Sequence, residues 1–166
     1  MNFWLSMSIA TTTLALLSTY FTGFALKKKD ISITNFLLGI FLAAILYGLF
    51  EAGNCLAQLI FHFAKLEISA IYDIRSEGQA LIIALVLFFV TSLGEELFWR
   101  AFLQRWAMKR FGGLGGWFLG AFLYAAAHVF SGNVMLILAA LVAGFFWGFL
   151  YWKSGSIFAC VISHAD

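Results

Sequence analysis

The chain has 166 residues, of which 63% are hydrophobic and 11% are charged, and its mean hydropathy is +0.96. Ordinary soluble domains are about half apolar and about a quarter charged, so this composition excludes a soluble globular protein. The net charge of +2 is too small to favour nucleic-acid binding. We therefore predict an all-α, polytopic helical bundle whose surroundings are the lipid bilayer, with no nucleic-acid partner.

Six helical segments are predicted in one membrane domain. They cover residues 3–26, 31–64, 80–108, 117–130, 133–152 and 157 to the end. Charge-free runs such as 80–93 and 133–152 are typical of membrane-spanning helices. The first segment lacks a basic start and a cleavage site, so we interpret it as a retained span and not as a signal peptide. Residues 1–79 are expected to form accessory helices, and residues 80–166 the core that carries the chemistry.

Between these segments, the mixed stretch 65–79 and the glycine-rich stretch 111–116 are predicted as connectors. If the segments alternate in direction, one side of the membrane collects Lys27, Lys28, Lys29, Arg105, Lys109, Arg110 and Lys153, and the other collects Lys65 and Arg75. Cytoplasmic connectors carry the excess of Lys and Arg. We therefore place the first side in the cytoplasm, the N-terminus outside, and the protein in a bacterial inner membrane.

Two segments have unusual lengths. Residues 31–64 would span about 50 Å as a helix, against a hydrocarbon core of about 30 Å. The far half of this segment carries a polar stripe on one face, made of Glu51, Asn54, Cys55, Gln58 and His62. The stripe is interpreted either as an amphipathic extension or as a groove that contacts substrate. The final segment covers only about 15 Å, so we expect it to be truncated.

The stretch GEELFWR places charged residues inside an apolar helix. Ionisable residues at membrane depth are costly and usually mark a functional site. Glu96 and Arg100 are four residues apart, which puts the carboxylate and the guanidinium on one helix face. Glu95 points about 100° away. We therefore expect Glu96 to be paired with Arg100 and Glu95 to remain available for chemistry.

Two histidines, His128 and His164, lie in other apolar segments. A single histidine of this kind is usually a core residue, but depth favours a shared role. Counted from the cytoplasmic ends of the helices, Glu95 lies about 14 Å deep, His128 about 16 Å and His164 about 10 Å. The sequence thus predicts a layer that contains one carboxylate and two imidazoles.

Such a layer suits the hydrolysis of an amide bond. A carboxylate among apolar groups holds a proton more tightly than in water, so it can act as a general base towards water. Imidazoles can share that water or donate to a developing oxyanion. The same three residue types also form zinc sites of hydrolases. The residues therefore leave a metal-free mechanism and a divalent metal held by Glu95, His128 and His164 both open.

The motif EELFWR resembles the E-E-x-x-x-R signature of the CAAX prenyl endopeptidase family and of its bacterial relatives, the CPBP (Abi) intramembrane proteases. The run from Tyr124 to His128 resembles the second motif of this family, in which an aromatic residue precedes a histidine. The stretch GSIFACVISHA, which contains His164, resembles the approach to the third motif. These three motifs are found in order over residues 80–166.

The resemblance implies a protease whose site lies inside the membrane. By this resemblance Glu95 activates water with help from His128, and Glu96 and Arg100 hold the helix geometry. His164 would stabilise the oxyanion, together with an Asn or Asp four residues later. That position lies beyond the sequence, and Asp166 is a poor substitute because it points about 160° away on a helix. Tyr124 stands where Phe is commoner, and we expect this change to be neutral.

The sequence therefore predicts an intramembrane endopeptidase of a membrane-associated or lipidated protein or peptide, with a site towards the cytoplasmic side. On the favoured hypothesis Glu95 activates the water without a metal. Two alternatives stay open, namely a peptide-binding or immunity protein without catalysis, and a small transporter or proton relay. The sequence indicates neither the substrate nor the oligomeric state.

Overall fold

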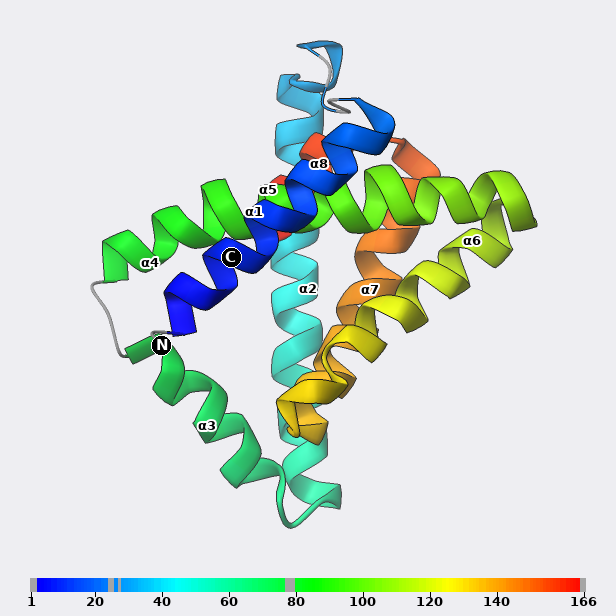
Figure 1. Ribbon diagram of the computed structural model, residues 1–166. Coiled ribbons are helices and arrows are strands. Elements are labelled where there is room, and N and C mark those ends of the chain that lie inside the picture. Colours follow the sequence, from blue (N-terminus) through cyan, green and yellow to red (C-terminus); the bar gives the residue numbers. More distant parts are fainter. Residues whose placement is uncertain (1–2, 24–25, 27, 77–79, 165–166) are drawn as a thin grey trace.

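The computed structural model describes residues 3–23, 26, 28–76 and 80–164, so Lys27 and Asp166 lie outside the described part. Over the described residues the chain is helical and contains no β-strand, which confirms the all-α prediction (Figure 1). The helices are α1 (Phe3–Thr22), α2 (Ile33–Ile60), α3 (Ala64–Ser76), α4 (Ala80–Val86), α5 (Leu93–Glu96), α6 (Arg105–Ala127), α7 (Val134–Ser154) and α8 (Ile157–His164). Two π-helical segments, η2 (Leu87–Ser92) and η3 (Leu97–Gln104), and two short 3-10 turns, η1 (Lys28–Asp30) and η4 (Val129–Ser131), complete the set.

Three helical stretches of the described chain are long and apolar enough to cross a membrane. They are Ile33–Ile60, Leu81–Ser131 and Val134–Ser154. The first predicted segment forms α1, but α1 is rich in Ser and Thr and does not reach that level of hydropathy. The composition and these three stretches identify the chain as a membrane protein.

The segments α4, η2, α5, η3 and α6 follow one another without a break up to Gly112, where the direction changes (Figure 1). Gly112 has φ 77° and ψ 169°, a conformation that glycine adopts without steric cost. The predicted connector at 111–116 is therefore reduced to a bend at one residue, and the helix resumes at once. Glu95 and Glu96 lie between the two π-helical segments, which widen the helix on both sides of them.

The prediction of a connector at 65–79 is wrong for most of that stretch, because residues 64–76 form α3. The helix is stabilised by a tertiary contact that its composition does not reveal. The carboxylate of Glu67 accepts from the backbone N–H of Met135 at 2.9 Å, and its carbonyl accepts from the Asn133 side chain at 2.8 Å. Asn133 in turn caps α7 by accepting from the N–H of Leu136. These contacts join α3 to the beginning of α7.

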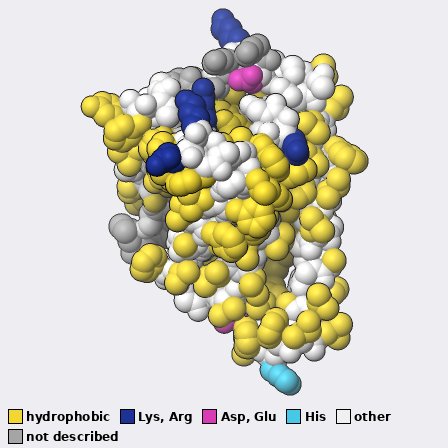
Figure 2. Space-filling model, turned by 90° about the vertical axis from the view of Figure 1, so that its right-hand side faces the viewer, with side chains coloured by type: hydrophobic (Ala, Val, Ile, Leu, Met, Phe, Trp, Pro, Cys, Tyr) yellow, Lys and Arg dark blue, Asp and Glu magenta, His cyan; other side chains and the backbone are white. Residues whose placement is uncertain are grey.

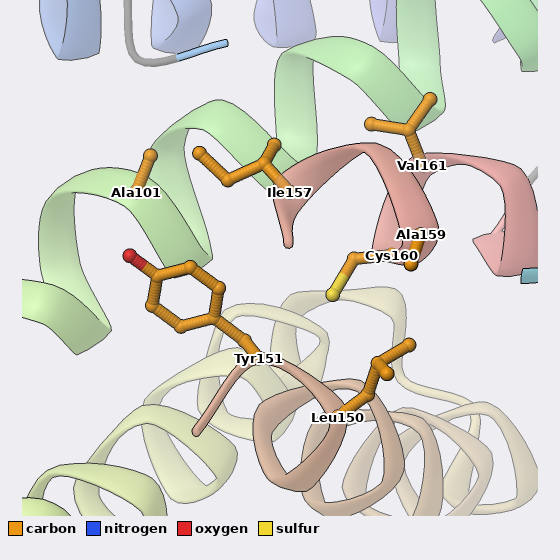
Figure 3. Close-up of a cluster of buried hydrophobic side chains, with 7 residues drawn as sticks. All are labelled: Ala101, Leu150, Tyr151, Ile157, Ala159, Cys160 and Val161. Carbon is orange, nitrogen blue, oxygen red and sulfur yellow. The ribbon is translucent and has the colours of Figure 1, made fainter. Parts of the chain in front are cut away.

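Helix α8 is held in the middle of the bundle, where it contacts α2, α7 and the run from η2 to η3. Its approach to α2 is close, because a Cβ on Gly39 would lie 2.6 Å from the Cβ of Ile162. Figure 3 shows the apolar core that joins α8 to its neighbours, made of Ala101, Leu150, Tyr151, Ile157, Ala159, Cys160 and Val161. This core fixes the position of the residues at the end of α8.

The outer surface of the bundle is largely hydrophobic, as expected for contact with lipid. Figure 2 shows Lys and Arg side chains gathered towards one end of the face in view, above a surface that is mostly apolar. The end of α7 is basic, because Lys153 lies in its last turn. Gly155, with φ 65°, terminates this helix. This separation of charge agrees with the positive-inside pattern of membrane proteins.

Candidate functional site

The ion pair predicted between Glu96 and Arg100 is present and buried. The Nε of Arg100 lies 3.2 Å from Oε2 of Glu96, and the two side chains are 2% and 0% exposed. The guanidinium also lies over two aromatic rings, 4.9 Å from the centroid of Tyr124 and 5.5 Å from that of Trp147. A buried carboxylate needs such partners, because an isolated charge in an apolar interior is very costly.

His164 contacts both glutamates. Its Nδ1 lies 2.8 Å from Oε1 of Glu96, and because the carboxylate can only accept, Nδ1–H is the donor. Its Nε2 then faces Oε2 of Glu95 at 3.9 Å, which is beyond direct hydrogen-bond distance. The imidazole stacks on Trp147 with the ring centroids 3.8 Å apart, and the indole N–H donates to the hydroxyl of Ser163. The orientation of His164 is thus fixed from two sides.

Glu95 is held by Tyr124. The phenol O–H donates to Oε2 of Glu95 at 2.9 Å, whereas Oε1 has no hydrogen-bond partner among the described residues. Tyr124 is itself 4% exposed, and its ring packs against that of Trp99 in a T-shaped contact with the centroids 5.3 Å apart. The carboxylate of Glu95 is 15% exposed, so it lies at the border of the buried cluster with one oxygen held and the other free.

His128 adjoins this cluster through Tyr124. Its Nδ1 lies 2.9 Å from the carbonyl oxygen of Tyr124, and because a carbonyl only accepts, Nδ1–H donates. In the neutral ring, Nε2 then carries the lone pair. The two rings are 4.9 Å apart. Among the described contacts, His128 makes no hydrogen bond to either glutamate.

The structure therefore brings Glu95, Glu96, Arg100 and His164 together. His128 is linked to them through Tyr124, which contacts both His128 and Glu95. Two links were missed from the sequence: the contact of His164 with Glu96, and the hydrogen bond from Tyr124 to Glu95. The hydroxyl of Tyr124, which phenylalanine lacks, is the group that holds Glu95, and the expectation that tyrosine is neutral at this position stays a prediction. The aromatic residue four positions before His128 was the available signal.

A comparison with protein-family models supplies the ancestry of this arrangement. The model described as type II CAAX prenyl endopeptidase Rce1-like matches residues 77–165, which include all five predicted site residues. The chain belongs to this family. Neither a comparison with curated proteins nor one with solved structures finds a significant match. The Rce1-like family is a family of membrane proteases, which supports the prediction of an enzyme that acts on a protein or peptide at the membrane.

A metal site in this Rce1-like chain would need Glu95, His128 and His164 to converge on one ion. The Nδ1 atoms of His128 and His164 are engaged by the Tyr124 carbonyl and by Glu96, which leaves both Nε2 atoms as the nitrogens that could ligate a metal. Among the described residues, no three His, Cys, Asp or Glu side chains lie close enough together to hold a metal ion. As they are placed, the side chains of Glu95, His128 and His164 are not brought together as a three-ligand set.

The polar stripe of the second predicted segment begins at Glu51, in the C-terminal half of α2. Of its members only Asn54 is partly buried, and it accepts from the amide of Gln58 at 2.6 Å. Asn54 lines an apolar cavity of about 350 Å³ between α2, α3 and α7. No described hydrogen bond joins the stripe to Glu95, Glu96 or His164. The stripe therefore does not form part of the glutamate cluster.

Proposed function

We propose that this chain is an intramembrane endopeptidase that hydrolyses a peptide bond of a membrane-associated or lipidated protein or peptide, with a water activated by Glu95. The observation that carries the proposal is the pair of polar atoms Oε2 of Glu95 and Nε2 of His164. They lie 3.9 Å apart at the edge of a buried cluster. That separation is too long for a direct hydrogen bond and suits a water that contacts both atoms.

Glu95 is proposed as the general base. Tyr124 donates its hydroxyl to Oε2 and holds the carboxylate, and the other lone pair of Oε2, the oxygen 3.9 Å from Nε2 of His164, is left for the proton of the water. A general base has to lie within hydrogen-bond distance of the proton that it takes and has to keep that geometry. The buried Tyr124 ring, packed between Trp99 and Arg100, supplies this rigidity.

In the proposed reaction, the water oxygen forms a bond to the scissile carbonyl carbon while one of its protons moves to Glu95. The carbonyl oxygen becomes an oxyanion, towards which protonated His164 donates from Nε2. Glu95 then passes the proton to the amide nitrogen, the C–N bond breaks, and a carboxylic acid and an amine are released. His128, with Nδ1 engaged by Tyr124, is proposed to accept from the water or the substrate through Nε2.

Glu96 and Arg100 are proposed as positioning residues and not as reacting groups. The Nδ1–H of His164 donates to Glu96, and this hydrogen bond orients the imidazole so that Nε2 faces Glu95. Arg100 in turn neutralises Glu96 at 3.2 Å. On this proposal the two adjacent carboxylates have different tasks, and the difference in their surroundings supports it, because Glu96 is fully buried and paired and Glu95 is 15% exposed.

We further propose that the N-terminus lies outside and the site faces the cytoplasmic side of a bacterial inner membrane. The basic surface in Figure 2 supports this orientation. Helix α8 begins directly after the basic end of α7, and His164 is the eighth residue of α8, about 10 Å along the helix.

The proposal is tested by comparing peptide termini in membrane and secreted fractions of the native host by mass spectrometry. Strains carry the wild type, Glu95→Gln, or the matched control Glu51→Gln, which changes an exposed glutamate of α2. We expect a specific set of termini to disappear with Glu95→Gln and to remain with Glu51→Gln. If all three strains give the same termini while the proteins are present and folded, the chain is not a protease and peptide binding takes its place.

A further inference from the structure

An open apolar groove lies between α2 and α7, and none of the five site residues lines it. Its volume is about 680 Å³. Leu38 and Leu42 line it on α2, and Val142 and Phe149 line it on α7. The groove stays open because α2 and α7 make few contacts with each other, whereas α2 packs closely on α8.

The length of this groove matches one leaflet of a membrane. Along α7 it extends from Val142 to Lys153, which is about 16 Å at a rise of about 1.5 Å per residue. A hydrocarbon core is about 30 Å thick, so the groove covers about half of it. The natural apolar ligand of this length is a single acyl chain of one leaflet.

One end of the groove is cationic. The ammonium of Lys153 lies over the ring of Trp152, 4.1 Å from its centroid, and 5.7 Å from that of Phe149. No carboxylate pairs with Lys153 among the described residues. Lysine and tryptophan together at a helix end are typical of the membrane–water interface. The polar end of a ligand in the groove would therefore meet an unpaired positive charge at the level of the lipid headgroups.

We propose that this groove is a binding site for one anionic phospholipid, with an acyl chain along α2 and α7 and its phosphate group against Lys153. Charge complementarity selects an anionic lipid over a zwitterionic one, because the phosphate of a zwitterionic lipid already has a cationic partner. The gathering of Lys and Arg at one end of the bundle in Figure 2 concentrates such lipids near the groove. This site is independent of the proposed protease activity.

The test is native mass spectrometry of the purified full chain in detergent, titrated separately with dioctanoyl phosphatidylglycerol, dioctanoyl phosphatidylcholine and inorganic phosphate. Lys153→Gln removes the charge at the groove. Arg110→Gln is the matched control, because Arg110 does not line the groove and lies over the ring of Phe111. Val142→Trp fills the groove from its lipid-facing side, where Val142 is 43% exposed and the larger side chain does not enter the core.

We expect the wild type to bind one phosphatidylglycerol about fivefold more tightly than phosphatidylcholine, the effect of one cation near a membrane surface. Lys153→Gln removes this preference, Val142→Trp prevents binding of both lipids, and Arg110→Gln leaves the preference unchanged. Inorganic phosphate alone gives no adduct. Equal binding of the two lipids by the wild type overturns the proposal, as does an equal loss with Arg110→Gln.

Discussion

Removing Arg100 tests how much the buried ion pair of Glu96 and Arg100 contributes to the stability of the protein. Arg100→Met keeps a long apolar side chain but leaves the carboxylate of Glu96, which is 0% exposed, without its guanidinium partner. Loss of one partner of a buried ion pair costs about 3–5 kcal/mol. The lower end of this range is expected, because the Nδ1–H of His164 still donates to Glu96 at 2.8 Å. We therefore expect Arg100→Met to lower the free energy of unfolding by about 3 kcal/mol.

The double variant Glu96→Gln/Arg100→Met separates the cost of an unpaired carboxylate at Glu96 from the cost of the lost packing of Arg100. A neutral amide oxygen at position 96 can still accept from His164, so no unpaired buried charge remains. The contacts of the guanidinium with Tyr124 and Trp147 are lost, which costs about 1–2 kcal/mol. The double variant should therefore be more stable than Arg100→Met alone, although it carries one more substitution.

The assay is equilibrium unfolding in mixed micelles with increasing sodium dodecyl sulfate, followed by circular dichroism and by tryptophan fluorescence. The order of stability expected is wild type, then the double variant, then Arg100→Met. A stability of Arg100→Met equal to that of the wild type would refute the claim that the pair neutralises a buried charge. The single variant Glu96→Gln is measured as well. A double variant whose loss equals the sum of the losses of Glu96→Gln and Arg100→Met would refute the claim that Glu96 and Arg100 act as a unit.

Two further substitutions test neighbouring contacts. Tyr124→Phe, measured on a peptide bond identified from the host, should lower kcat by about tenfold with little change in KM, because a hydrogen bond to a charged group contributes about 1.5–3 kcal/mol. Tyr151→Phe, at another buried tyrosine, is the control, and an equal effect of both would remove Tyr124 from the site. Gly94→Ala should lower stability by about 1–3 kcal/mol, since its Cβ would lie 2.7 Å from the backbone oxygen of Thr11. Gly53→Ala has nothing within 4 Å and should be neutral or stabilising in thermal unfolding, so equal losses would contradict the close approach of α1.

Contacts along one helix could be predicted from the sequence, and contacts between helices could not. The pair of Glu96 and Arg100 follows from a spacing of four residues within one turn. The 2.8 Å contact of His164 with Glu96 depends instead on how α8 packs in the bundle. A common depth placed Glu95 and His164 in one layer, but depth says nothing about rotation around each helix. For this reason the role of the Tyr124 hydroxyl was missed.

The errors in the predicted elements have a similar cause. Residues 64–76 look like a polar connector, yet they form α3 because Glu67 accepts from the beginning of α7. A helix that gains its stability from a distant partner carries little local signal. The glycines at 111–116 suggested an extended turn, whereas only Gly112 takes a positive φ. Neither π-helical segment beside Glu95 has a sequence pattern that marked it in advance.

The central claim is that Glu95 activates the attacking water, and the most direct test is the cleavage rate of purified Glu95→Gln. The assay uses the full chain in proteoliposomes and a peptide that contains a bond identified by the comparison of termini. Because general base catalysis contributes about 10²–10⁴-fold, we predict that the rate falls at least about a hundredfold while the thermal unfolding midpoint is retained. Cleavage at the wild-type rate by folded Glu95→Gln would contradict the account.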